Sequence, residues 1–386
     1  MGYYFSLEKK MTDFIPVNEP SIGYREKELV LQALDSGWIS SEGPFVSQFE
    51  ELLSGRVNRS YGIACSSGTA ALDIAVQALG IGPGDEVILP SFTIISCASA
   101  IYRTGATPVP VDVHPNLWNI TAENIEPAIN SNTVAIMMVH IYGLPVDIDP
   151  ILNLATKYSL AVIEDAAELI GGSYKDKPCG SFGTISTFSF YPNKHITTGE
   201  GGMVLTNDHQ LATRCQSLRN LCFKPESRFI HEEIGWNYRL TNIQAALGIA
   251  QLEKLDQTLL QKAHIGSLYY DLLCSIPDIC LPTTTTPYSN NIYWVFGLVL
   301  GDSYSINVAD IMSELRKLHV GSRPFFYPIH LQPVFTKLGL FKNISLPVSE
   351  KLATNGFYIP SGVTLSDSDI FEVSTKLSSI LSKYHS

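Results

Sequence analysis

The chain has 386 residues and a formal net charge of −11 at pH 7, with 45% hydrophobic and 16% charged residues. This length allows one large core and a smaller second domain, while the acidity argues against nucleic-acid binding, which needs a basic footprint. The longest apolar runs, such as Trp294–Leu300, are far shorter than the roughly 18 residues of a membrane span, so we expect no membrane partner.

Short β-branched runs alternate with helical patterns between about residues 60 and 210. The runs are brief, apolar and bounded by Gly, Pro or charges, as buried strands are. They predict strands at 86–89, 107–111, 134–139, 160–163, 185–190 and 202–206. Helical patterns occupy 69–79, 122–129, 147–158 and 242–268. Strands separated by crossover helices predict an α/β fold with a mostly parallel sheet covered on both faces.

The composition shifts to Pro, Thr, Ser and Asn at residues 277–291. We interpret this stretch as a surface connection within a smaller C-terminal α+β domain. The predicted division is a large domain over 1–255, in which 1–14 form a peripheral segment, and a small domain over 256–386.

The seven cysteines are scattered, without a CxxC pair or metal-ligand spacing. An odd, scattered set is typical of reduced thiols in a cytoplasmic protein. We therefore predict no metal site.

The strongest chemical signal is the segment from Ser189 to Gly202, in which Lys194 follows a predicted strand and precedes a glycine cluster. A lysine held in a pocket can lose its proton and attack a carbonyl, as Schiff-base lysines do. A surface turn with a chance lysine is the alternative.

A second signal is Asp165, at the carboxyl end of a predicted central strand. Ligands of open α/β sheets bind at this edge, and a carboxylate there can keep a pyridine nitrogen protonated. By itself, Asp165 is better explained as a helix cap that follows a strand.

The third signal is Ser67-Gly68-Thr69 at a predicted helix start. Small residues let several N–H groups converge on a phosphate, and the helix dipole favours the anion. Ordinary N-cap chemistry also uses these residues. Together, the phosphate cradle, the pyridinium partner and the amine indicate pyridoxal 5′-phosphate.

With these motifs the chain resembles the DegT/DnrJ/EryC1/StrS sugar aminotransferases, which have the aspartate-aminotransferase-like fold type I. The resemblance covers about residues 15–360. Its other motifs are Ser36–Ser41, His140-Ile-Tyr-Gly143 and Gly235–Thr241.

The resemblance implies that Lys194 carries the cofactor, with pyridoxamine 5′-phosphate as its aminated form. It also implies that Ser189 adds a hydroxyl to the phosphate site and that Glu168 lies near the cofactor ring. Asn237 would reach the phosphate of a neighbouring subunit, which implies a homodimer with shared active sites. Many members have an aromatic residue that stacks on the cofactor where this chain has Ile94, and isoleucine offers no π-stacking.

The segment from Ser322 to His330 most resembles enzymes that form GDP-perosamine from GDP-4-keto-6-deoxy-D-mannose, with L-glutamate as the expected amino donor. A proline-rich loop that packs aromatic rings is the alternative for this segment. Surface ion pairing is an alternative for two of the arginines, Arg219 and Arg239. The predicted contacts to the nucleotide sugar are Trp38, Ser40, Arg219, Arg239, Arg323, Tyr327 and His330.

Three other functions stay open at this stage. A UDP-linked 4-keto-6-deoxy-hexose is an alternative substrate, because sequence separates the bases poorly. A sugar 3-dehydratase of the same family would have histidine in place of Lys194, and here His195 merely follows it. A non-catalytic protein with this fold would normally lack the lysine or the aspartate, and both are present.

Overall fold

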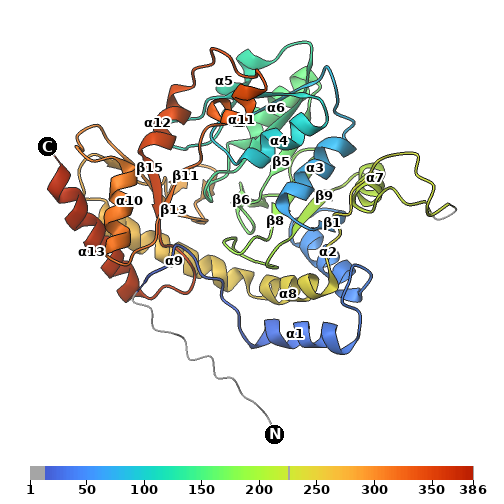
Figure 1. The fold of residues 1–386 in the computed structure, drawn as a ribbon, viewed down its shortest axis with the longest axis horizontal. Helices are drawn as coiled ribbons and strands as arrows, with labels where there is room; N and C mark the ends of the chain where they lie inside the picture. The colour runs from blue at the N-terminus through green and yellow to red at the C-terminus, as the bar shows by residue number, and fades with distance from the viewer. Residues whose placement is uncertain (1–13, 225–226, 386) are drawn as a thin grey trace, which may run out of the picture.

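A computed structural model describes residues 14–224 and 227–385 (Figure 1). Its larger sheet has seven strands in the order β1-β9-β8-β5-β4-β2-β3. Among these described strands only β9 runs in the opposite direction to the others, so the prediction of a mostly parallel sheet is confirmed. The strands are Tyr61–Cys65 (β1), Glu86–Pro90 (β2), Thr107–Val111 (β3), Thr133–Val139 (β4), Ala161–Asp165 (β5), Ile185–Ser189 (β8) and Gly202–Thr206 (β9).

Helices cover both faces of this sheet, because side chains alternate across a strand. On β1, Ile63 packs into a core with residues of α3, α4 and α7, while Ala64 packs into another with residues of α1, α2 and α8. The helices are Tyr24–Asp35 (α1), Pro44–Arg56 (α2), Gly68–Ala78 (α3), Ile95–Arg103 (α4), Ala122–Ile125 (α5), Ile148–Tyr158 (α6), His209–Arg219 (α7) and Asn242–Glu253 (α8).

Two predicted helices differ from the structure. The stretch at 242–268 is two helices, α8 and Leu255–Leu273 (α9), with Lys254 between them at φ −105°. The stretch at 122–129 is the short α5 followed by a 3₁₀ turn at Glu126–Ala128. Pro127 lies in that turn, and proline lacks the N–H that a continuing helix needs.

A smaller antiparallel sheet follows, in the order β10-β13-β15-β14. Residues of α9, α10 and α13 pack against it in a separate core, and Figure 1 shows α8 and α9 running from the larger sheet toward α10 and α13. The predicted surface connection holds the short hairpin β11–β12. The bounds are Ser173–Tyr174 (β6), Lys177–Pro178 (β7), Ile279–Cys280 (β10), Thr285–Thr286 (β11), Ser289–Asn290 (β12), Phe296–Leu300 (β13), Val308–Lys317 (α10), Arg323–Pro324 (β14), Pro333–Lys337 (α11), Pro347–Asn355 (α12), Gly356–Ile359 (β15) and Asp367–Tyr384 (α13).

The predicted domain boundary falls at the start of α9, and the division itself stays a prediction. Ile15 forms a parallel bridge with Val320 and is buried in the core of the smaller sheet. The chain just after the predicted peripheral segment therefore packs on the C-terminal part. Residues 1–13 lie outside the described residues.

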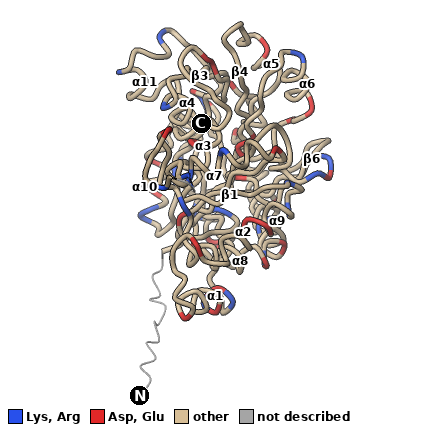
Figure 2. Tube along the Cα trace, turned by 90° about the vertical axis from the view of Figure 1, so that its right-hand side faces the viewer, with Lys and Arg blue, Asp and Glu red and all other residues tan. Residues whose placement is uncertain are grey.

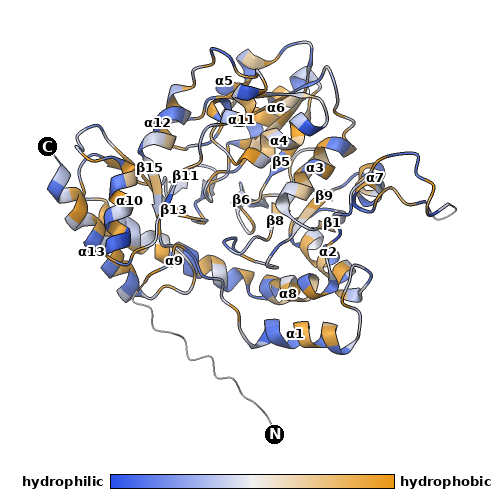
Figure 3. Ribbon diagram, viewed as in Figure 1, coloured by the Kyte–Doolittle hydropathy of each residue, from blue (hydrophilic) through white to orange (hydrophobic). Residues whose placement is uncertain are grey.

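Charged residues of both signs are spread over the molecule, and hydropathy alternates along its helices. Figure 2 shows acidic and basic residues interspersed along the trace, and Figure 3 shows polar and apolar segments alternating along α8 and α13. Such alternation is typical of helices that bury one face. None of the helices described here is long and apolar enough to cross a bilayer.

Candidate active site

Lys194 lies in the loop between β8 and β9, and its side chain is only 10% exposed. Its Nζ lies 3.8 Å from Oε1 of Glu168 and 3.8 Å from the centre of the Trp294 ring. Burial lowers the pKa of Lys194, and the negative charges of Glu168 and Asp165 oppose this effect. The pocket therefore favours the neutral, nucleophilic amine more than water does.

Asp165 ends β5 and is 1% exposed. Its Oδ1 accepts hydrogen bonds from the Ala167 N–H (3.0 Å) and the Thr187 hydroxyl (3.4 Å), and its Oδ2 accepts one from the Cys97 thiol (3.3 Å). Burial raises the pKa of Asp165, whereas the hydrogen bonds from Ala167 and Cys97 lower it. Among the described residues, Oδ2 has only this weak thiol donor, so it retains capacity to accept a hydrogen bond from a protonated pyridine nitrogen.

A second buried carboxylate supports the end of β5. Glu164 accepts backbone hydrogen bonds from Gly180 (2.6 Å) and Phe182 (2.8 Å). Its Oε1 also lies 3.0 Å from Nε2 of His140. Nδ1 of His140 accepts a hydrogen bond from Val146 N–H, so Nε2 carries the proton and donates to Glu164. This network anchors the strand that presents Asp165.

Glu168 is held by the turn of the His140–Gly143 motif. The backbone N–H of Tyr142, a residue with φ 56°, donates to Oε2 of Glu168 at 2.9 Å. Left-handed backbone at a non-glycine residue is uncommon and often occurs at functional sites. Burial raises the pKa of Glu168 to about 7, although the nearby Lys194 opposes the shift.

The predicted phosphate cradle lies at the start of α3. Ser67 is the N-cap, and its hydroxyl accepts a hydrogen bond from Ala70 N–H. The Gly68 and Thr69 amides have no hydrogen-bond acceptor among the described residues, as expected for the first turn of a helix. A Cβ at Gly68 would lie 2.7 Å from Cβ of Ser189. The cradle and Ser189 are therefore in close contact.

The start of α4 adjoins this cradle. The hydroxyls of Thr69 and Ser96 lie 2.8 Å apart. Ile94, the N-cap of α4, is 41% exposed, so its side chain is free to cover a ligand. Asn237 is also exposed, and its predicted contact with a neighbouring subunit stays a prediction.

The chain matches the DegT/DnrJ/EryC1/StrS aminotransferase family over residues 20–378. It is 39% identical to a GDP-perosamine synthase of Caulobacter vibrioides over 95% of this chain and 98% of that protein. A GDP-perosamine synthase of Escherichia coli O157:H7 is likewise 39% identical, over 93% and 96%. The crystal structure of an aminotransferase from Psychrobacter cryohalolentis is 30% identical, with a TM-score of 0.89 over 97% and 100%.

The chain belongs to this aminotransferase family. It is a sugar aminotransferase that uses pyridoxal phosphate. The described residues fit this cofactor: the cradle has free amides for a phosphate, Asp165 is a buried acceptor, and Lys194 is a desolvated amine. The family and fold expected from the sequence are confirmed.

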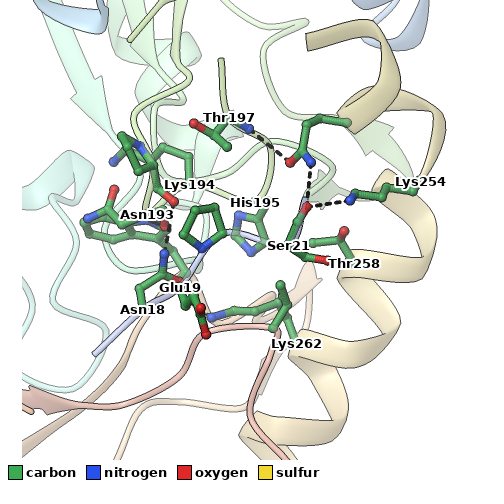
Figure 4. A pocket seen from close by; sticks show the side chains of 15 residues that line it. Asn18, Glu19, Ser21, Asn193, Lys194, His195, Thr197, Lys254, Thr258 and Lys262 are labelled. Carbon is green, nitrogen blue, oxygen red and sulfur yellow. Dashed lines mark hydrogen bonds between the residues drawn. The ribbon is translucent and has the colours of Figure 1, made fainter. Parts of the chain in front are cut away.

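The dehydratase alternative is disfavoured by the orientation of His195. Its buried side chain makes a 3.1 Å hydrogen bond with the Ile292 carbonyl. Figure 4 shows it beside Lys262, in a small pocket of about 20 Å³ under the Lys194 loop. Burial lowers the pKa of His195 to about 3, so the ring is neutral at physiological pH.

The predicted substrate residues fall into two groups. Trp38, Ser40, Arg323 and Tyr327 are exposed and accessible to a ligand. Arg219 instead pairs with Glu50 at 2.5 Å and donates to the Ala64 carbonyl at 2.7 Å. Arg239 donates to the side chain of Asn220. The structure thus accounts for both of these arginines by internal pairing, the alternative left open by the sequence.

His330 needs a correction, because its side chain is fully buried. Its Nδ1 lies 2.7 Å from the Ser91 hydroxyl and its Nε2 3.1 Å from Oε1 of Glu350. Both ring nitrogens are thus engaged, and no face is left for a substrate. His330 instead connects the C-terminal segment to the end of β2.

Sequence reasoning missed Trp294, Cys97 and Ser96 as site residues. Trp294 contacts the Lys194 amine, Cys97 contacts Asp165, and Ser96 contacts the cradle. Cys97 and Ser96 follow the carboxyl end of the strand predicted at 86–89, where ligands of such sheets bind, and this position is the one sequence signal that indicates them. Trp294 is 100 residues from Lys194, and no local pattern links the two.

Proposed function

We propose that this aminotransferase transfers an amino group from L-glutamate to C4 of GDP-4-keto-6-deoxy-D-mannose and forms GDP-perosamine. The identity to two GDP-perosamine synthases over almost their full lengths carries this proposal. A third relative with this name, from Vibrio cholerae, is 36% identical. The product would serve lipopolysaccharide O-antigen biosynthesis, where amino sugars are incorporated.

A groove of about 750 Å³ supports the proposal that the substrate is an anionic nucleotide sugar. Its wall includes Tyr191, Pro192 and Asn193, which immediately precede Lys194, and it is also lined by Arg316 and Arg323. No Asp or Glu lines it among the described residues, although the chain carries 37 of them. Two arginines in a described lining without Asp or Glu favour a local positive field suited to a diphosphate.

The residues of the pocket suit a proton-transfer reaction. When bound, pyridoxal phosphate supplies an electron sink for the carbon that loses a proton. Lys194 Nζ would remove the proton from the α-carbon of glutamate and later deliver one to C4 of the sugar. Asp165 would hold the proton of the pyridine nitrogen, and Ser67, Gly68, Thr69 and Ser189 would bind the phosphate.

We also infer a homodimer in the cytoplasm. The segment that follows α7 has three strongly exposed apolar side chains, Phe229 (81%), Ile230 (69%) and Ile234 (92%). Covering such a patch with a second copy removes apolar surface from water, and Asn237 lies close by in sequence. All seven cysteines are free thiols, in keeping with a reducing compartment.

The test is a panel of GDP- and UDP-linked 4-keto-6-deoxy sugars, each incubated with the purified protein, pyridoxal phosphate and L-glutamate. Mass spectrometry should detect the 4-amino product from the GDP-linked mannose derivative. Preferential conversion of a UDP-linked sugar would replace this proposal by the UDP alternative. Absence of any aminated sugar would overturn the substrate assignment.

A further inference from the structure

The indole ring of Trp294 covers the amine of Lys194. The side chain is 6% exposed and lies just before β13, in the C-terminal part of the chain. Lys194 Nζ is 3.8 Å from the ring centre, well inside the range of about 6 Å in which an ammonium is attracted to an aromatic face. The contact therefore stabilises the protonated amine and restricts where it can lie.

Two hydrogen bonds anchor Trp294 beside the Lys194 loop. Its Nε1–H donates to the carbonyl of Asn193 at 2.8 Å, and its own carbonyl accepts from Lys262 Nζ at 3.0 Å. Lys262 is buried and also donates to the Ser361 carbonyl at 2.5 Å. Figure 4 shows Asn193, Lys194 and Lys262 around the same small pocket. The ring is thus fixed relative to the residue that precedes Lys194.

The turn that holds Glu168 fits tightly against the Trp294 backbone. Gly143 has φ 99°, and a Cβ there would lie 2.5 Å from Trp294 N. The N–H of Ile292 donates to the Gly143 carbonyl at 2.9 Å. Glycine is therefore required at position 143 both by the backbone conformation and by the close approach. The turn that holds Glu168 on one side of the amine thus packs directly on the backbone of Trp294, which lies on the other side.

The charged and titratable groups around Lys194 come from several elements. Glu168 and Asp165 face it from the segment at the end of β5, Cys97 from α4, and His195 from its own loop. Lys262 of α9 acts on His195. Glu168 carries charge for only part of the neutral pH range, because its pKa is about 7. The indole face does not titrate, so its attraction for the ammonium is independent of pH as long as Lys194 is protonated.

We propose that Trp294 is a further active-site residue, which holds the free Lys194 amine at the position from which it attacks the cofactor aldehyde. In that step the Nζ lone pair would form a bond to the aldehyde carbon, the carbon–oxygen bond would break, and the oxygen would leave as water with the two protons of the neutral amine. Lysine has a flexible four-carbon stem, and transamination frees it in every cycle. An aromatic wall keeps the amine in place while it is free.

The experiment measures the attachment of pyridoxal phosphate to cofactor-free protein by visible absorbance, from pH 6 to 10. Only the neutral amine attacks. Trp294→Leu removes the attraction that favours the ammonium, so the pH of half-maximal rate should fall by about one unit. The limiting rate at high pH should also fall several-fold, because the amine is less well positioned. Trp294→Phe keeps an aromatic face that attracts the ammonium more weakly. Its pH midpoint and its limiting rate should therefore lie between those of the wild type and those of Trp294→Leu.

Trp118→Leu is the matched control. Trp118 is also buried, at 3% against 6% for Trp294, and its ring packs on Tyr142 and Phe325 rather than on Lys194. This variant should keep the wild-type pH midpoint. Unchanged midpoints in both Trp294 variants, or an equal shift in Trp118→Leu, would overturn the proposal. No sugar takes part in the assay, so its result is independent of the proposed substrate.

Discussion

Glu168 faces the amine of Lys194 across 3.8 Å with one carboxylate oxygen, while its other oxygen accepts the Tyr142 amide. The two groups are nearly buried and have pKa values shifted toward each other, Glu168 upward and Lys194 downward. Such matched groups can exchange a proton near neutral pH, as acid–base catalysis requires.

The pKa of Glu168 makes stability depend on pH. Its value rises from 4.5 to about 7 on folding, so the folded protein binds this proton more tightly. The resulting stabilisation is full below about pH 4.5 and is lost as the pH rises through 7. Glu168→Gln removes this dependence. Between pH 5 and 8, we expect the unfolding free energy of the wild type to fall relative to Glu168→Gln by up to about 3 kcal/mol.

Urea unfolding of the wild type and of Glu168→Gln, each without cofactor, at pH 5 and at pH 8 measures the difference between their free energies of unfolding. The half-buried Glu28, which lies away from the Lys194 pocket on α1, provides the control, since Glu28→Gln should track the wild type. A constant difference between wild type and Glu168→Gln across this range would contradict the raised pKa.

Lys194→Ala removes the proposed nucleophile and proton carrier. We expect turnover to fall by at least about 10³-fold and the visible band of the attached cofactor to disappear. Lys175→Ala, which removes an exposed lysine, should change neither. Transamination by Lys194→Ala at the wild-type rate would show that the assignment is wrong.

Gly68→Ala tests the phosphate cradle. The added methyl group would lie 2.7 Å from Cβ and 2.9 Å from Oγ of Ser189, so one of them must shift. We expect the dissociation constant for pyridoxal phosphate to rise by about 10- to 100-fold, which corresponds to roughly 1.4–2.8 kcal/mol. Gly55→Ala in α2 is the control, because its Cβ would meet nothing within 4 Å. Equal cofactor affinity of both variants would argue against the cradle.

His195→Ala separates transamination from dehydration. The ring is buried and stays neutral because its pKa is about 3. The variant should therefore still form the amino sugar, with an unchanged pH–rate profile. It should lose about 1–3 kcal/mol of stability, because the Ile292 carbonyl loses its partner. A dehydrated sugar made by the wild type and lost in this variant, detected by mass, would instead support the dehydratase alternative.

Arg323→Met tests the groove. The exposed guanidinium is expected to bind the substrate diphosphate, so KM for the nucleotide sugar should rise by about 10- to 100-fold with little change in kcat. The effect should weaken at high salt, which screens exposed charges. Arg25→Met is the control, since Arg25 of α1 pairs with Glu28 of the same helix and with Glu253 of α8. A wild-type KM in Arg323→Met would exclude this contact.

Six of the seven strands of the larger sheet could be predicted, because periodicity and punctuation are local properties, whereas β1 and the helices α1, α2, α4 and α7 were not among the predicted elements. The strands at 107–111 and 202–206 have the predicted bounds. The break at Lys254 was not predictable, since an apolar helical pattern runs across it. The helix breaks at Lys254 because α8 packs against the larger sheet, whereas most of α9 packs against the smaller one.

The sequence by itself determined the fold class and the cofactor chemistry of this protein. Lys194, Asp165 and the Ser67–Thr69 cradle each follow a strand, and parallel strands bring their carboxyl ends to one edge. Only the tertiary structure decided which side chains surround them. It buried His330, paired Arg219 with Glu50 and placed Trp294 on the Lys194 amine. These contacts join segments far apart in the chain, and they depend on packing that no local pattern encodes.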